Sequence, residues 1–171
     1  MRKKAGYSFC DLLITIQVKQ FCLRFSCIHI PQVGAMTISV VRLGSPRAKG
    51  EGLRIGTVRR PPRGVRKEDY AAKDIYDVWF PNLAPSEALL KTASPPLDET
   101  TWRAFSRKFR AEMKQPAARR DLDLLAALSH QLDFAIGCYC EDESRCHRSI
   151  LRALLEARGA ALKSTGAGRK S

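Results

Sequence analysis

The segment FAIGCYCEDESRCHRSILRALL, residues 134–155, decides the fold class of this chain. Its apolar start, residues 134–138, is typical of a buried strand. An acidic loop follows, and apolar residues then recur at helical spacing from Ile150 to Leu155. The order strand, loop, helix indicates an α/β fold. Such folds bind ligands beyond the carboxyl ends of their strands, so the sequence predicts a site at this junction.

The rest of the chain supplies the other elements of such a fold. β-Branched and aromatic runs predict further strands, and apolar residues three or four apart predict helices. Pro116 is expected to break one helix, and Trp79 and Phe80 are expected in the core. The predicted strands are 37–43, 53–58, 75–80 and 132–139, and the predicted helices are 87–92, 99–115, 121–130 and 144–157. We therefore predict a single α/β domain: a central sheet of about four strands flanked by helices, with a strand-loop-helix site near the C-terminus.

Composition divides the chain into three parts. Residues 1–35 are interrupted by charged side chains and contain no stretch near the roughly 20 apolar residues of a membrane span. They are interpreted as a leader outside the domain, with translation, or at least the folded unit, expected to begin at Met36. We expect the domain over 36–160 and a disordered basic tail over 161–171, where glycine and polar residues prevail. A cytoplasmic protein without membrane association is predicted.

The chain is strongly basic, with a net charge of +13 and a pI near 9.9. Removing residues 1–35 removes five Lys and Arg and one Asp, so the remainder still carries +9. An anionic partner fits this charge, although many small proteins are simply basic. Nucleic-acid binding is expected to be weak and salt-sensitive, because the cations are not interleaved with aromatic platforms for stacking bases.

The loop RRPPRG, residues 59–64, is a candidate anion clamp. Pro61 and Pro62 stiffen it and Gly64 permits a turn, so Arg59 and Arg63 would be held at low entropic cost. Arginine binds phosphate or carboxylate through two parallel hydrogen bonds. The alternative is an ordinary solvated loop.

The junction holds Cys138, Cys140, Cys146 and His147, and three hypotheses explain them. Buried cysteines can serve simply as small apolar side chains. A zinc site is the second hypothesis, but C-x-C-x5-C-H lacks the usual paired spacing. The third is a reactive thiolate, because a helix N-terminus lowers a cysteine pKa.

The thiolate hypothesis names catalytic candidates and anion ligands. Cys146, Cys140 and His147 would be catalytic, and no metal or other cofactor is expected. Arg145 and Arg148 would bind an anion with Arg59 and Arg63. The acids of residues 141–143 oppose this hypothesis, since they could neutralise the arginines.

From Met36 to about Gly159 the chain resembles the YeaO-like proteins, the small bacterial domain of unknown function 488. Four motifs carry the resemblance, at residues 59–69, 79–91, 102–113 and 138–151. The resemblance implies a compact α/β domain and supplies no established reaction. The family usually has an aspartate before the first arginine of the proline loop and Leu-Trp within it, where this chain has Val58 and Arg60-Pro61. An acid-base role for that aspartate cannot be carried over.

The junction alone resembles the active-site loop of rhodanese-type sulfurtransferases, in which a cysteine accepts sulfur and loop amides cradle an anion. Here Cys140 is followed by EDES and Arg145 in place of a glycine-containing basic loop. Two classes of function stay open. One is an enzyme or binding domain for a phosphorylated or carboxylated small molecule, and the other is a non-enzymatic, nucleic-acid-associated or regulatory protein.

Overall fold

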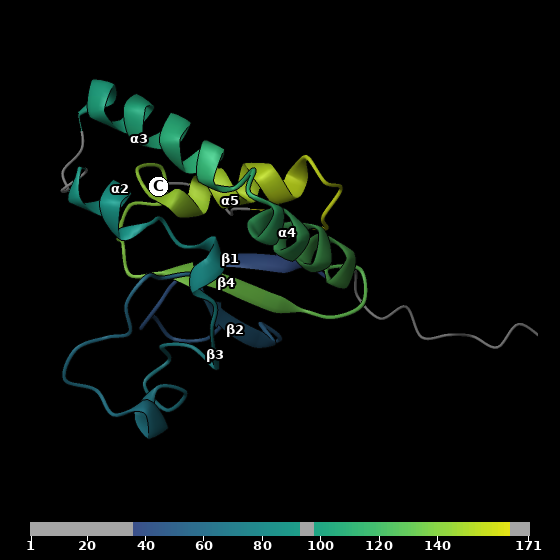
Figure 1. Cartoon of the computed structure of the whole chain (residues 1–171). Helices are drawn as coiled ribbons and strands as arrows, with labels where there is room; N and C mark the ends of the chain where they lie inside the picture. The colour runs from purple at the N-terminus through teal and green to yellow at the C-terminus, as the bar shows by residue number, and fades with distance from the viewer. Residues whose placement is uncertain (1–35, 93–97, 165–171) are drawn as a thin grey trace, which may run out of the picture. The chain divides into compact units, whose positions relative to one another are not determined.

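The computed structural model describes residues 36–92 and 98–164 (Figure 1). Its centre is a four-stranded sheet of order β1-β4-β2-β3, in which each pair of neighbouring strands is parallel. The strands are β1 (Ile38–Arg42), β2 (Leu53–Gly56), β3 (Val78–Trp79) and β4 (Phe134–Cys138). The predicted single α/β domain is confirmed, while the predicted leader, residues 1–35, lies outside the described residues.

The last strand in the chain occupies an inner position in the sheet. β4 pairs along its whole length with β1, from Ile38 opposite Phe134 to Arg42 opposite Cys138, and its other edge pairs with β2. All five of its residues are buried. A parallel strand covered on both faces needs a continuous apolar run, which is what residues 134–138 provide.

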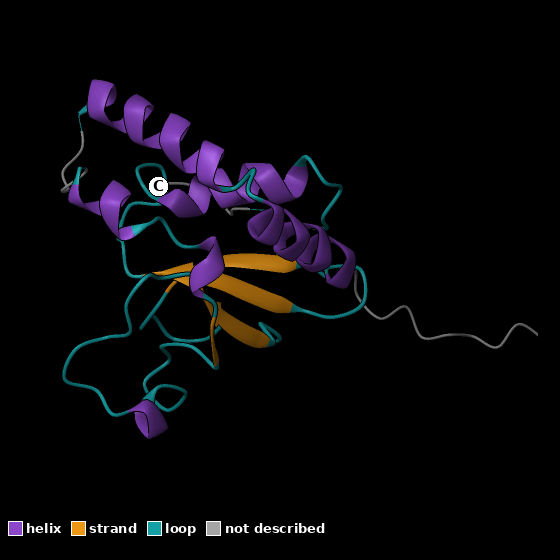
Figure 2. Cartoon of the chain, in the orientation of Figure 1, coloured by secondary structure: helices purple, strands orange, loops and turns teal. Residues whose placement is uncertain are grey.

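The helices gather on one side of the sheet, while the segment between β2 and β3 lies on the other (Figures 1 and 2). The helices are α2 (Glu87–Lys91), α3 (Glu99–Glu112), α4 (Pro116–Leu128) and α5 (His147–Glu156), with 3-10 turns η1 (Lys67–Asp69) and η2 (Pro81–Leu83). Their apolar faces pack on the sheet through residues such as Phe109, Leu122 and Leu151, each fully buried.

Helix starts follow the capping chemistry of the sequence. The Ser86 hydroxyl accepts a hydrogen bond from the Leu89 amide over 3.1 Å, and Asp98 accepts one from Thr101 over 2.7 Å. Pro116 was expected to break a helix, with the next beginning at Asp121. Instead it opens α4, because proline suits the first turn, where its missing N–H has no helical partner.

Trp79 is not in the core, contrary to expectation. β3 is only two residues long and lies at the sheet edge, so 45% of Trp79 stays exposed. Its indole Nε1 donates to the Val58 carbonyl oxygen over 2.8 Å. The side chain thereby fixes the start of the proline loop.

A buried ion pair closes the amino end of β2. Arg54 is fully buried and donates through Nε and Nη2 to the two carboxylate oxygens of Glu51, over 2.6 and 2.9 Å. Its Nη1 donates to the carbonyl oxygens of Ser45 and Asp74. One side chain therefore ties together the loop after β1 and the segment before β3.

The chain continues beside β1 beyond the predicted domain end at residue 160. The Ile38 amide donates to the Ala161 carbonyl over 2.8 Å, and the Lys163 amide donates to the Ile38 carbonyl over 2.9 Å. These bonds satisfy the outer edge of β1, which explains why ordered pairing runs into the segment assigned to the tail. Within residues 36–92 and 98–164, no helix has the length and apolar character needed to cross a membrane.

Candidate functional site

The candidate site lies where β2 and β4 end side by side. Because the two strands are parallel neighbours, residues 57–59 and 138–140 leave the sheet at the same edge. A cavity of about 420 Å³ opens there. It is lined by Val58, Arg59, Arg60, Pro85, Glu87, Leu90, Lys91, Cys138, Tyr139, Cys140 and His147.

His147 is held in one orientation by the end of β2. It is the first residue of α5 and is only 6% exposed. Its Nε2 lies 2.7 Å from the Thr57 carbonyl oxygen. A carbonyl can only accept, so Nε2 carries the proton and Nδ1 is left as an acceptor. Nδ1 lies 3.7 Å from the Cys146 sulfur, within hydrogen-bond distance of it.

Three thiols form one cluster around this histidine. The Cys138 and Cys140 sulfurs are 3.7 Å apart, and ligand atoms of Cys138, Cys146 and His147 lie within 4.8 Å of one another. Cys138 and Cys146 are buried, while Cys140 is half-buried and lines the cavity. Of the two catalytic cysteines predicted from sequence, Cys140 is therefore the one that a small molecule in the cavity can reach.

The buried cation Arg148 adjoins this cluster. It is 2% exposed, and its Nη2 donates to the Cys140 carbonyl oxygen over 2.7 Å. Its Nε is buried without a hydrogen-bond partner, and no carboxylate of the described residues lies within ion-pair distance of it. Arginine stays protonated at physiological pH, so burial without an acid calls for another anion nearby.

The neighbouring groups shift the pKa values of the three thiols in different directions. A hydrogen bond from Cys138, then one from Cys146, and the charge of Arg148 lower the pKa of Cys140, against the effect of burial. The hydrogen bonds of Cys138 to Cys140 and to Cys146, and then its burial, raise the pKa of Cys138. The hydrogen bond from Cys138 lowers the pKa of Cys146, whereas the hydrogen bond between Cys146 and Cys140 raises it. Cys140 is thus the favoured thiolate and Cys138 its proton donor.

No acid of the loop forms an ion pair with Arg145 or Arg148, although the charges of both arginines, after the Ser144 hydrogen bonds, help to lower the pKa of Asp142. Glu141 pairs with Arg42 over 3.1 Å and Glu143 pairs with Arg152 over 2.7 Å. Asp142 accepts from the amide and hydroxyl of Ser144. The objection raised by the sequence is therefore weakened, because these acids have other partners.

The four predicted anion ligands are scattered. Arg59 lines the cavity, with Nε and Nη2 donating to the Pro85 and Ala84 carbonyl oxygens. Arg63 is exposed in the proline loop and does not line the cavity. Arg145 is also outside it and pairs with Glu99 over 2.8 Å. Arg148 lies behind the cluster instead of facing the cavity.

Two cations of the cavity are outside the set of four predicted anion ligands, although Arg60 belongs to the loop predicted as an anion clamp. Arg60 pairs with Glu87 across the cavity over 3.1 Å, and Lys91 comes from the end of α2. Thr57, whose carbonyl orients His147, was missed by sequence reasoning. No sequence pattern links α2 to the proline loop, and Thr57 looks like an ordinary strand residue.

The same atoms could hold a metal. Thiolate sulfur and imidazole nitrogen are ligands that zinc prefers, and Cys138, Cys146 and His147 converge closely enough for one ion. The Nε2 bond to Thr57 would leave Nδ1 as the ligand atom. Metal binding and a free thiolate are thus competing uses of this cluster.

Comparison with known proteins gives one family. A family model named DUF488-N3a, described as "Active DUF488-N3 subclade", matches residues 38–159. No curated protein matches the chain, and no solved structure matches it. The matched range contains every residue of the cavity and of the thiol cluster.

Proposed function

We propose, from the premise that this chain belongs to the DUF488 family, that it acts on an anionic small molecule through the thiolate of Cys140. The carrying observation is the buried Arg148 beside Cys140, a cation without a carboxylate partner among the described residues. A thiolate at Cys140 supplies the missing negative charge. It would then be present at neutral pH, at the floor of the cavity.

The cavity walls would attract and orient an anionic substrate. Arg59 keeps Nη1 free of hydrogen bonds to the described residues, and Lys91 has no ionic partner among them. Glu87 is already paired with Arg60, so the net charge of the wall is positive. A phosphorylated or carboxylated small molecule would place its anionic group against these cations, with an electrophilic atom toward Cys140.

The neighbouring side chains have roles in this mechanism. The Cys138 thiol donates to the nucleophile and keeps it ionised. His147, fixed by Thr57, contacts the Cys146 sulfur through Nδ1 and would hold that residue in position. Neither His147 nor Cys146 needs to touch the substrate. Cys146 is then a positioning residue, and Cys140 is the nucleophile.

Sulfur transfer is a second candidate, favoured by the two thiols 3.7 Å apart. The Cys140 thiolate would attack the outer sulfur of a thiosulfate-like anion, forming a persulfide and releasing sulfite. The Cys138 thiol would donate to the new terminal sulfur. Thiosulfate followed by intact-protein mass spectrometry tests this candidate, since a persulfide adds one sulfur atom to Cys140.

The main proposal is tested by alkylation with iodoacetamide across a pH series, with peptide mapping to assign the modified cysteine. Cys140 should react fully well below pH about 8.5, the ordinary pKa of cysteine, while Cys138 stays unmodified. Inorganic phosphate should protect Cys140 and raise the melting temperature by mass action. The variants Arg59→Gln and Lys91→Gln should lose that protection, whereas Arg63→Gln should keep it. Slow alkylation of Cys140 at every pH below 8.5 would refute the proposal.

A further inference from the structure

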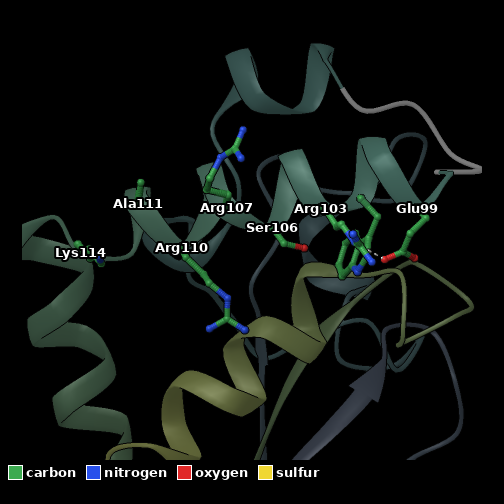
Figure 3. A pocket seen from close by; sticks show the side chains of 8 residues that line it. Glu99, Arg103, Ser106, Arg107, Arg110, Ala111 and Lys114 are labelled. Carbon is green, nitrogen blue, oxygen red and sulfur yellow. Dashed lines mark hydrogen bonds and ion pairs between the residues drawn. The ribbon is translucent and has the colours of Figure 1, made fainter.

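A second hollow lies on α3, away from the thiol cluster. The groove measures about 630 Å³ and is lined by Glu99, Trp102, Arg103, Ser106, Arg107, Arg110, Ala111 and Lys114. Figure 3 shows Glu99 at the start of α3, Lys114 just beyond its end, and Arg107 and Arg110 pointing to opposite sides of the helix. None of them belongs to the cavity that contains Cys140.

The groove is strongly cationic. Arg103, Arg107, Arg110 and Lys114 follow a spacing of four, three and four residues, so they form a stripe along the helix. Arg103 is paired with Glu99 over 2.9 Å. The other three cations have no ion pair with any of the described residues, and Arg107 and Arg110 are exposed. Three uncompensated charges in a row favour an extended polyanion over a single small anion.

The length of the stripe suits a phosphate backbone. Arg103 and Arg110 are seven residues apart on α3, about 10 Å along its axis, since each residue rises 1.5 Å, and Lys114 lies just beyond the end of the helix at Glu112. A strand of nucleic acid carries a phosphate for about every 3.4 Å of helix axis, so several phosphates would face the stripe. A protein partner with a comparable row of acids would need a dedicated sequence, whereas any nucleic acid supplies the row.

The groove also offers an aromatic side chain that could contact a base. Trp102 lines the groove, and its ring stacks on Phe105 with the ring centroids 5.6 Å apart. In a duplex the bases are stacked and paired, so only an unpaired strand can present a base face to Trp102.

We infer that the α3 groove binds single-stranded nucleic acid through its phosphates, with a base against Trp102. This inference is independent of the thiolate proposal. Glu99 links the groove to the junction. Its carboxylate pairs with Arg103 of α3 and also with Arg145, which belongs to the loop after Cys140. A strand in the groove would therefore lie beside that loop.

The test is fluorescence anisotropy of the full chain with labelled oligothymidine and oligouridine of about 12 nucleotides, titrated with salt. The variant Arg107→Gln/Arg110→Gln/Lys114→Gln should bind about tenfold more weakly at about 50 mM salt. Its log-log salt slope should fall by about 2, because each phosphate contact in a single strand contributes about 0.7. The control Lys49→Gln/Arg66→Gln/Lys73→Gln changes the net charge equally, on other exposed segments, and should bind like the wild type.

Further measurements test the inference. Trp79→Phe leaves Trp102 as the only tryptophan, whose fluorescence should be quenched by either oligonucleotide. Cys140→Ser should bind the oligonucleotides unchanged, which separates this inference from the thiolate proposal. Equal loss of affinity in both triple variants would overturn the inference. So would tighter binding to a duplex of equal length, or to phosphatidylserine vesicles, than to the single strands.

Discussion

Arg148 donates a hydrogen bond from Nη2 to the carbonyl oxygen of Cys140 over 2.7 Å, so a buried cation lies directly behind the thiol that lines the cavity. The two residues are eight positions apart, at either end of the acidic loop. This contact couples the shape of the loop to the charge of the thiol, and the first predictions test it.

Replacing Arg148 should raise the pKa of Cys140. The Cys138 hydrogen bond is the largest cause of the lowered pKa, and the charge of Arg148 also contributes. In Arg148→Met the pH midpoint of Cys140 alkylation should move upward, by about one pH unit for each 1.4 kcal/mol of lost interaction with the thiolate. Arg145→Met is the matched control, because Arg145 pairs with Glu99 on the surface. An equal shift in both variants would show that only general charge matters.

Removing the Cys138 thiol should raise the pKa of Cys140 further than removing Arg148 does. Cys138→Ala deletes the hydrogen-bond donor 3.7 Å from the Cys140 sulfur. The alkylation midpoint of Cys140 should move toward pH about 8.5. Cys146→Ala, which deletes a secondary donor, should have the smaller effect of the two. The reverse order would mean that Cys146 is the principal proton donor.

Stability should depend on pH through Cys140. Its folded pKa is lowered, so below pH about 8.5 the unfolded chain binds the extra proton and the free energy of unfolding rises with pH. This contribution is lost as pH falls toward the folded pKa. Urea titrations from pH about 5 to 8 should show wild type gaining on Cys140→Ser by up to about 1.4 kcal/mol per pH unit. If the free energies of unfolding of the two proteins changed in parallel with pH, the proposal that Cys140 is a thiolate in the folded protein would be contradicted.

Chelation should leave Cys140 reactive. If the cluster is a thiolate site, prolonged treatment with a chelator changes neither the melting temperature nor the alkylation rate. A zinc site held by Cys138, Cys146 and His147 would instead give stoichiometric metal by elemental analysis and unfolding on chelation. Those two observations together would show that the cluster is a structural zinc site and not a catalytic thiolate.

Breaking the buried ion pair should destabilise the fold. Arg54→Met leaves the Glu51 carboxylate buried without its partner, which typically costs about 3–5 kcal/mol in unfolding free energy. Arg54→Met/Glu51→Met should recover part of this loss, because no unpaired charge is then buried. Chemical denaturation of the three proteins measures both steps. A double variant less stable than Arg54→Met would show that the Glu51 carboxylate, which also accepts from the Ala48 amide, stabilises the fold even without Arg54.

Two glycines provide a comparison of close packing. Gly52 and Gly50 both have positive φ, 72° and 73°. A Cβ at Gly52 would lie 1.9 Å from the Asp133 carbonyl oxygen, whereas one at Gly50 meets nothing within 4 Å. Gly50→Ala should therefore cost about 1 kcal/mol, from backbone strain alone, and Gly52→Ala clearly more. Equal melting temperatures would mean that the backbone near Asp133 yields easily.

The strand-loop-helix junction was predictable because each part has a local signature. An apolar run, an acidic loop and a helical repeat follow one another in residues 134–155, and short-range propensity suffices to recognise them. The choice between Cys140 and Cys146 was not predictable. The two residues flank the same acidic loop, and only the packing of the loop and α5 buries Cys146 while Cys140 lines the cavity.

Buried charges were the other feature beyond sequence reasoning. In the alternating run of residues 53–58, Arg54 looks like a solvent-facing residue, yet it is fully buried. Its burial depends on Glu51 and on two backbone carbonyls, whose positions follow from tertiary structure. The same holds for Arg148, whose position beside Cys140 depends on how α5 packs.

The inner position of β4 has a consequence for how the chain acquires its structure during synthesis. β1 and β2 emerge first, but each pairs with β4, which is about 80 to 100 residues later in the chain. Such long-range pairing is slow, because a large loop must close before any contact is gained. The sheet therefore cannot assemble until the ribosome has made residues 134–138. The three thiols of the site come together only after that step, so the contacts that lower the pKa of Cys140 form late in folding.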